Sequence, residues 1–141
     1  MGSVLLITEN SLKTYTQEIY ELSCPFDNMY QGKAARYLFV CSAGMLRSPT
    51  AASVADRLGY NARSCGSAEY ALIPISVNLI NWANKIFFME ENNYHQTEEA
   101  FFGDSETLKM LRDKSVVWEI EDYYDRNAPT LRAKVEELLT M

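Results

Sequence analysis

Residues 36–50 read RYLFVCSAGMLRSPT, and this stretch decides the predicted fold. Its apolar first part, Arg36–Val40, predicts a β-strand that ends at Cys41. The segment Ser48–Leu58 predicts a helix, and Gly59 is placed to end it. A strand, a short loop and a helix in this order are typical of proteins in which helices pack on a parallel sheet.

The rest of the chain repeats this alternation. Further strands are predicted at Val4–Thr8, Asn61–Ser64, Lys85–Met89 and Ser115–Ile120, and further helices at Ser11–Leu22, Ile75–Ala83, Glu90–Ala100, Asp104–Arg112 and Pro129–Leu139. We therefore expect an α/β fold, a three-layer sandwich in which helices flank a four-stranded parallel sheet. Residues 1–141 would form a single domain, with residues 36–141 as the core and residues 1–35 as an N-terminal βα extension. Ligands of such sheets bind where the strands end, which directs attention to the segments after Val40, Met89 and Ile120.

The composition narrows the class of partner. The formal net charge of −6 disfavours nucleic acid and anionic membrane surfaces as partners. Because Cys24, Cys41 and Cys65 form no CxxC pair, we expect neither a disulfide framework nor a zinc site. We predict a cytoplasmic protein with reduced thiols that uses no metal and no other cofactor. No apolar run in the sequence is long enough to cross a membrane.

The loop from Cys41 to Arg47 has the residues of a phosphate cradle. Backbone N–H groups between a strand and a helix N-terminus bind anions, and Gly44 permits the positive φ of a tight turn. Arg47 offers a planar pair of donors to two phosphate oxygens, and the same field stabilises the nucleophilic thiolate of Cys41. Ser48 either donates to that sulfur or caps the helix. The expected phosphate-binding residues are Ser42, Ala43, Gly44, Met45, Leu46, Arg47 and Ser48.

Chemistry at a phosphate monoester also needs a proton donor for the leaving oxygen. Residues 121–125, directly after the last expected strand, read EDYYD. The candidate donors are Glu121, Asp122 and Asp125, and the alternative is that all three form a solvated acidic turn. Tyr123 and Tyr124 could form an aromatic wall for a phosphoaryl ring, or could be partly buried against the last helix.

At these residues the sequence resembles the low-molecular-weight protein tyrosine phosphatase family, and more narrowly its small bacterial and phage branch of predicted protein tyrosine phosphatases. Residues 40–51, VCSAGMLRSPTA, match the signature loop of the family. Residues 63–67, RSCGS, are similar to its short SAG turn, and residues 82–90, WANKIFFME, are similar to its WAD-IFVME stretch. The resemblance runs from about Arg36 to the C-terminus, with the cysteine loop early and the acid loop late, as in the family.

The resemblance implies a protein phosphatase that hydrolyses phosphate monoesters, phosphotyrosine above all, through a thiophosphate intermediate. The substrate would be a phosphorylated protein or a small phosphomonoester. Cys41 would be the nucleophile, Arg47 would hold the phosphate, and Asp122 would be the general acid, since it matches the Asp of the family's IEDPYY-like run. Three residues depart from the family. The Pro after that Asp is replaced by Tyr123, Gly44 stands where the family usually has an Asn that helps to hold the loop, and Leu46 stands where the family often has a second Cys that protects the nucleophile as a disulfide.

Two other functions stay open. A non-enzymatic phosphate-binding or regulatory module would keep the loop without turnover, and Gly44 and the missing Pro favour it. An arsenate reductase shares the fold and the loop but needs relay cysteines, for which only Cys24 and Cys65 are present. The extension at residues 1–35 could lengthen the sheet, cover the cleft or form a dimer contact.

Overall fold

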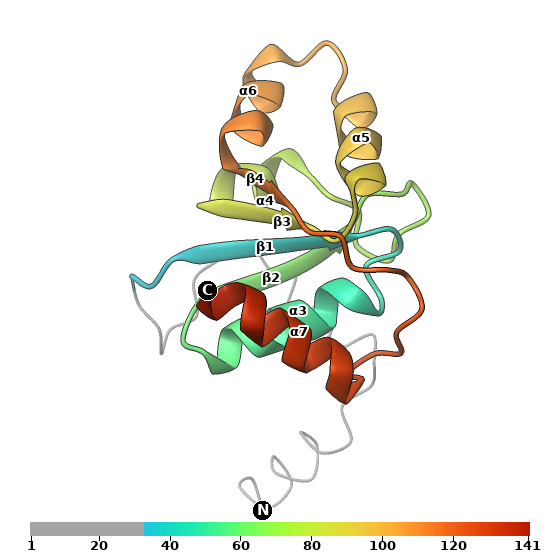
Figure 1. Cartoon of the computed structure of the whole chain (residues 1–141). Coiled ribbons are helices and arrows are strands. Elements are labelled where there is room, and N and C mark those ends of the chain that lie inside the picture. The colour runs from blue at the N-terminus through green and yellow to red at the C-terminus, as the bar shows by residue number, and fades with distance from the viewer. Residues whose placement is uncertain (1–32) are drawn as a thin grey trace, which may run out of the picture.

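A computed structural model gives the structure of the chain and describes residues 33–141. Within that range four strands form one parallel sheet in the order β2-β1-β3-β4 (Figure 1). The strands are β1 (Arg36–Cys41), β2 (Asn61–Gly66), β3 (Lys85–Phe88) and β4 (Ser115–Val117). The four-stranded parallel sheet expected from the sequence is confirmed. The predicted strand Val4–Thr8 and helix Ser11–Leu22 of the N-terminal extension lie outside the described residues.

Helices cover both faces of the sheet, which confirms the three-layer α/β architecture (Figure 1). On one face lie α3 (Arg47–Arg57) and α7 (Pro129–Thr140). On the other lie α4 (Val77–Trp82), α5 (Glu91–Ala100) and α6 (Ser105–Lys114). Within residues 33–141 no helix combines the length and the apolar character that crossing a bilayer requires.

The central strand β1 divides the core into two halves. Phe39 belongs to the buried cluster under α3 and α7, whereas Leu38 and Val40 belong to the cluster against α4 and α6. All three side chains are fully buried, and each contributes about 2 kcal/mol of hydrophobic stabilisation. A strand buried on both faces reads as a continuous apolar run, and that run is what predicted β1.

Helix α3 leads directly out of the loop that follows β1. It ends as the sequence predicts: Gly59 has φ +99°, its N–H donates to Asp56 O, and the N–H of Tyr60 donates to Ala55 O, both at 3.1 Å. At the other end the N-cap residue is Leu46, and no side chain of the described residues caps it. The positive end of the helix therefore faces the loop without a side-chain acceptor.

Two elements are each three residues shorter than the sequence predicts. Helix α4 begins at Val77 because Ser76 caps it, accepting a hydrogen bond from Leu79 N at 3.2 Å. Strand β4 ends at Val117, yet the chain beyond it stays beside β3. The N–H of Trp118 donates to Phe88 O at 2.7 Å, and the N–H of Ile120 donates to Met89 O at 2.9 Å. These bonds carry the chain to the carboxyl edge of the sheet.

Candidate active site

Segments that follow three different strands meet at one edge of the sheet. Arg47, in the first turn of α3, connects them through its guanidinium group. Its Nη1 donates to a carboxylate oxygen of Glu90, just after β3, and to Ile120 O at 2.8 Å. Its Nε lies 3.4 Å from Asp122 Oδ1. These contacts bring together the segments after β1, β3 and β4, to which the sequence directs attention.

The guanidinium of Arg47 is buried, and two of its nitrogens, Nη1 and Nε, have partners in the fold. The residue is 1% exposed. A buried charge without a partner costs several kcal/mol, so the carboxylate of Glu90 and the carbonyl of Ile120 determine where the guanidinium can lie. Sequence reasoning did not name Glu90 as a site residue. The available signal was an acidic residue placed directly after a buried strand.

Cys41 is the last residue of β1 and is 3% exposed. Its Sγ lies 3.1 Å from Ser48 Oγ, which is also 3.1 Å from Cys65 O. Of the two roles open to Ser48, contact with the sulfur is therefore the one observed. Burial raises the pKa of the Cys65 thiol well above its usual range, and nearby Cys41 raises it further. Within residues 33–141 no group of three or more His, Cys, Asp or Glu side chains is arranged to hold a metal ion.

The backbone of the Cys41–Arg47 loop turns its carbonyl groups away from the site. The carbonyl oxygens of residues 41, 42 and 43 accept hydrogen bonds at 2.8, 3.0 and 3.2 Å from N–H groups in the segment 67–72. The N–H groups on the other side of the loop are left for a ligand. Those that donate to no residue described by the structure are the N–H groups of Ser42, Ala43, Gly44 and Leu46. Successive free N–H groups beside a helix N-terminus form an anion nest.

Gly44 is required by the geometry of this loop for two reasons. Its φ is +71°, the positive value that the sequence argument anticipated. The second reason is contact with strand β2, since a Cβ on Gly44 would lie 2.9 Å from both Cys65 C and Gly66 N. The asparagine usual in the resembling family therefore does not fit at this position without a shift of the backbone.

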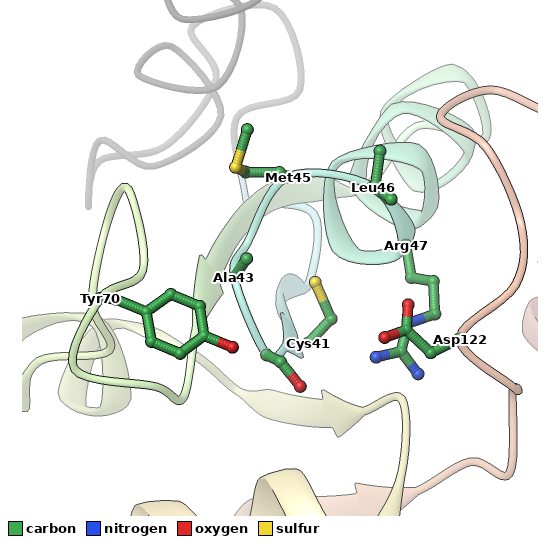
Figure 2. Close-up of a pocket in the computed structure, with 8 residues that line it drawn as sticks. Cys41, Ala43, Met45, Leu46, Arg47, Tyr70 and Asp122 are labelled. Atoms are coloured by element: carbon green, nitrogen blue, oxygen red, sulfur yellow. The ribbon is translucent and has the colours of Figure 1, made fainter.

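A cavity of about 260 Å³ opens at the loop (Figure 2). Its lining consists of Cys41, Ser42, Ala43, Met45, Leu46, Arg47, Tyr70 and Asp122. Most of the expected phosphate-binding residues are therefore in the lining, while Gly44 and Ser48 support the loop without lining the cavity. Figure 2 shows Tyr70 on one side of the loop and Asp122 beside Arg47 on the other.

Tyr70 is the lining residue that sequence reasoning missed. It is 77% exposed and lies in the loop after β2, at the same edge of the sheet as Cys41. An exposed aromatic residue in a loop that follows a parallel strand was the signal that could have identified it.

The three candidate acids differ in where they lie. Asp122 lines the cavity and contacts Arg47, and its side chain is 60% exposed, whereas neither Glu121 nor Asp125 is part of the lining. Tyr123 and Tyr124 stack on each other with centroids 4.4 Å apart, and neither lines the cavity. Tyr124 packs against the core cluster that includes α7, as the second of the two sequence alternatives supposes.

The segment that carries Asp122 is tied to the rest of the fold at both ends. At its start the N–H of Ile120 donates to Met89 O at 2.9 Å. At its end the N–H of Asn127 donates to Thr50 Oγ1 in α3 at 2.8 Å, and Asn127 has φ +60°. These two bonds constrain a segment that lacks the proline of the resembling family.

No protein-family model matches the sequence, and no curated protein matches it either. Solved structures do match. The arginine phosphatase YwlE from Geobacillus stearothermophilus aligns at a TM-score of 0.59 with 19% identity, over 75% of this chain and 88% of that one. The tyrosine phosphatase Wzb from Escherichia coli K30, in complex with phosphate, aligns at 0.55 with 17% identity, over 74% and 92%. The low-molecular-weight protein tyrosine phosphatase from Campylobacter jejuni aligns at 0.52 with 12% identity, also over 74% and 92%. With its parallel sheet, its loop after the central strand and these structural neighbours, the chain has the fold of the low-molecular-weight protein tyrosine phosphatases.

Proposed function

We propose that this protein is a cysteine-dependent phosphatase of the low-molecular-weight tyrosine phosphatase family, acting on phosphate monoesters and, among these, on phosphotyrosine. One observation carries the proposal: a nearly buried thiol, a loop with free N–H groups, a fixed guanidinium and an exposed carboxyl group share one cavity of about 260 Å³. A nucleophile, an anion cradle and a proton donor are the parts that phosphate ester hydrolysis needs.

In the first step the thiolate of Cys41 attacks phosphorus in line with the leaving oxygen. The S–P bond forms as the P–O bond to the leaving group breaks, and Asp122 gives its proton to the departing oxygen. The loop N–H groups and Arg47 hold the three equatorial oxygens, over which the transition-state charge is spread. The hydroxyl of Ser48, 3.1 Å from the sulfur, can donate to the thiolate before the attack.

In the second step the thiophosphate is hydrolysed. Asp122, now a carboxylate, takes a proton from water as the water oxygen attacks phosphorus and the S–P bond breaks. The step releases inorganic phosphate and restores both the thiolate and the protonated acid. Asp122 Oδ1 lies 3.4 Å from Nε of Arg47, so a phosphate held by Arg47 would compete with Asp122 for that donor. Binding of the substrate then frees the carboxyl group for the leaving oxygen.

The lining of the cavity favours an aryl phosphate over a phosphorylated guanidine. Met45 and Leu46 are apolar, Tyr70 offers an aromatic face, and Asp122 is the one carboxyl group that residues 33–141 contribute to the lining. An aromatic ring is stabilised by such surroundings, whereas a phosphorylated guanidinium still needs acceptors for its several remaining N–H donors. A phosphoarginine substrate is the sharpest comparison, because one of the structural neighbours is named an arginine phosphatase.

Turnover of p-nitrophenyl phosphate tests the proposal. We expect hydrolysis that vanadate inhibits and that Cys41→Ser abolishes while phosphate binding persists. Phosphotyrosine peptides should be hydrolysed with a higher kcat/KM than phosphoarginine. Phosphate binding by the unmodified protein without turnover of any of these substrates would instead support a non-enzymatic module.

The role of Asp122 is tested against its two neighbours. Asp122→Ala should lower kcat by about 10²-fold to 10⁴-fold, most strongly for phenols with a high pKa, because these leave poorly without a proton. Glu121→Ala and Asp125→Ala are matched controls, since neither carboxyl group lines the cavity. If either control slowed the reaction in that leaving-group-dependent way and Asp122→Ala did not, the assignment of the acid would be wrong.

A further inference from the structure

Helix α5 begins beside the phosphate loop and places one amide side chain, that of Asn93, between two parts of the site. Asn93 is 1% exposed. Its Nδ2 donates to Ser42 Oγ at 3.0 Å and approaches Ser67 Oγ at 3.3 Å, and its Oδ1 accepts from the backbone N–H of Glu90 at 3.1 Å. Every polar atom of the amide group therefore has a partner at the site or directly beside it.

These partners belong to the two halves of the phosphate cradle. Ser42 is the residue after Cys41 and lines the cavity. Glu90 is the carboxylate that holds the guanidinium of Arg47. A displacement of Asn93 would therefore move the first residue of the loop and the partner of the loop arginine together. No other side chain within residues 33–141 bonds both to the loop and to the backbone of Glu90.

Position 44 contributes no side-chain contact that could hold the loop. Gly44 has no side chain, and a Cβ there would meet the backbone of Cys65 and Gly66 at 2.9 Å. The other anchors of the loop are backbone bonds from the segment 67–72 and side-chain hydroxyls: that of Ser48 contacts the Cys41 sulfur, Thr50 Oγ1 donates to Leu46 O at 2.7 Å, and Ser67 Oγ donates to Cys41 O at 3.4 Å. Asn93 in α5 adds a bond to the side chain of Ser42.

We propose that Asn93 is a positioning residue that holds the phosphate loop and the Glu90–Arg47 pair in register with each other. Its effect on catalysis rests on the proposed phosphatase function, while its effect on anion binding does not. Asn93 is not part of the cavity lining, so its amide acts through Ser42 and Glu90. Removing it leaves the half-buried Ser42 hydroxyl and the Glu90 N–H without their Asn93 partner and lets the two halves of the cradle move apart.

The test measures binding of inorganic phosphate by titration calorimetry and, separately, the melting temperature without any anion. Asn93→Ala should raise the Kd for phosphate by about threefold to tenfold, the equivalent of one buried hydrogen bond. Asn92→Ala is the matched control, because Asn92 is the same residue type on the same turn but is exposed. It should leave the Kd unchanged. A lower melting temperature with an unchanged Kd would show that Asn93 is merely structural and would overturn the proposal.

A double substitution tests the route through Ser42. Ser42→Ala should also raise the Kd, and the two changes together should raise it by less than the product of their separate factors, because they remove the same contact. Fully multiplicative effects would refute the link. If Asn93→Ala does not fold, Ser42→Ala carries the test alone, and an unchanged Kd in that variant would count against the proposal.

The same binding measurements separate this inference from the proposed function. If Asn93→Ala weakens phosphate binding but the unmodified protein hydrolyses no phosphate ester, the positioning role stands and the enzymatic role is refuted. If the Asn93→Ala and Asn92→Ala variants turn over p-nitrophenyl phosphate equally well, the enzymatic role stands and the positioning role is refuted. An unmodified protein that binds no phosphate would overturn both.

Discussion

Replacing Gly44 by alanine tests whether the loop after β1 is packed against β2 or merely needs a flexible residue. Alanine at this position meets two separate penalties. The φ of +71° is unfavourable for any residue with a Cβ. The added Cβ would also lie 2.9 Å from Cys65 C and Gly66 N, two backbone atoms that cannot rotate away. These atoms are held by the pairing of β2 with β1 and by the bond from Gly66 N to Ile73 O at 2.9 Å.

The two penalties have different sizes and can be separated. The left-handed backbone costs about 1–2 kcal/mol, and overpacking against a fixed neighbour adds about 1–3 kcal/mol. Gly44→Ala should therefore lower the free energy of unfolding by roughly 2–5 kcal/mol. Gly59→Ala is the matched control: its φ is +99°, but a Cβ there meets nothing within 4 Å, so it should lose only about 1–2 kcal/mol. The entropy that alanine removes from the unfolded chain is common to both and cancels in the comparison.

Urea denaturation of the three proteins, followed by fluorescence, gives both differences directly. Equal losses at the two glycines would refute the packing argument and leave only the backbone one. Gly44→Asn extends the test, because asparagine tolerates a positive φ but still brings a Cβ. We expect this residue, usual in the resembling family, to destabilise the loop here. A stable Gly44→Asn variant with unchanged phosphate affinity would show that β2 can give way.

Three further outcomes are expected. Arg47→Lys should raise the Kd for phosphate by at least about tenfold, since a single ammonium cannot replace the paired donors of the guanidinium, and an unchanged Kd would contradict its role. Iodoacetamide should alkylate Cys41, and phosphate should slow that reaction. Cys65 should stay unmodified in the folded protein, because burial raises the pKa of its thiol. Peptide mapping that finds Cys65 modified as fast as Cys41 would argue against this expectation. Protonated His95 donates hydrogen bonds to the carboxylates of Glu98 and Glu91, and these bonds raise the pKa of the exposed imidazole. The imidazolium therefore stabilises the fold below the unfolded-state pKa of about 6.5, and that stabilisation is lost as the pH rises through the higher folded-state pKa. His95→Gln should accordingly lower the melting temperature at about pH 5 and leave it unchanged at about pH 9. A larger drop in melting temperature at about pH 9 than at about pH 5 would contradict this direction of the pH dependence.

The parts of this molecule that the sequence predicts are those in which neighbouring residues decide the outcome. The run Arg36–Val40 is apolar because β1 is central and buried on both faces, so a local pattern suffices to find it. The end of α3 at Gly59 is equally local. The start of α4 is also local, since Ser76 caps the helix through the N–H of Leu79. The end of β4 at Val117 is harder to predict, because the chain beyond it is held by bonds to Phe88 and Met89.

The parts that could not be predicted are contacts between residues far apart in the sequence. Tyr70 lines the cavity because the loop after β2 returns to the end of β1, which no short window of sequence reveals. The pairing of Arg47 with Glu90 and of Asn93 with Ser42 each spans more than forty residues. Resemblance placed Asp122 in the acid loop, but only the fold brings it to within 3.4 Å of Arg47.

The two hydrogen bonds that fix the ends of the segment carrying Asp122 bear on how the specificity of the proposed enzyme could change. The bonds at Ile120 and Asn127 leave residues 121–126 as a short insert between fixed points. Cys41, the proposed nucleophile, lies by contrast on β1, the buried central strand of the sheet. If the protein acts as proposed, substitutions or length changes within the insert would alter which leaving groups are accepted and would leave phosphate binding by the Cys41–Arg47 loop unchanged. New specificities of the proposed enzyme could therefore arise in residues 121–126 at little risk to folding.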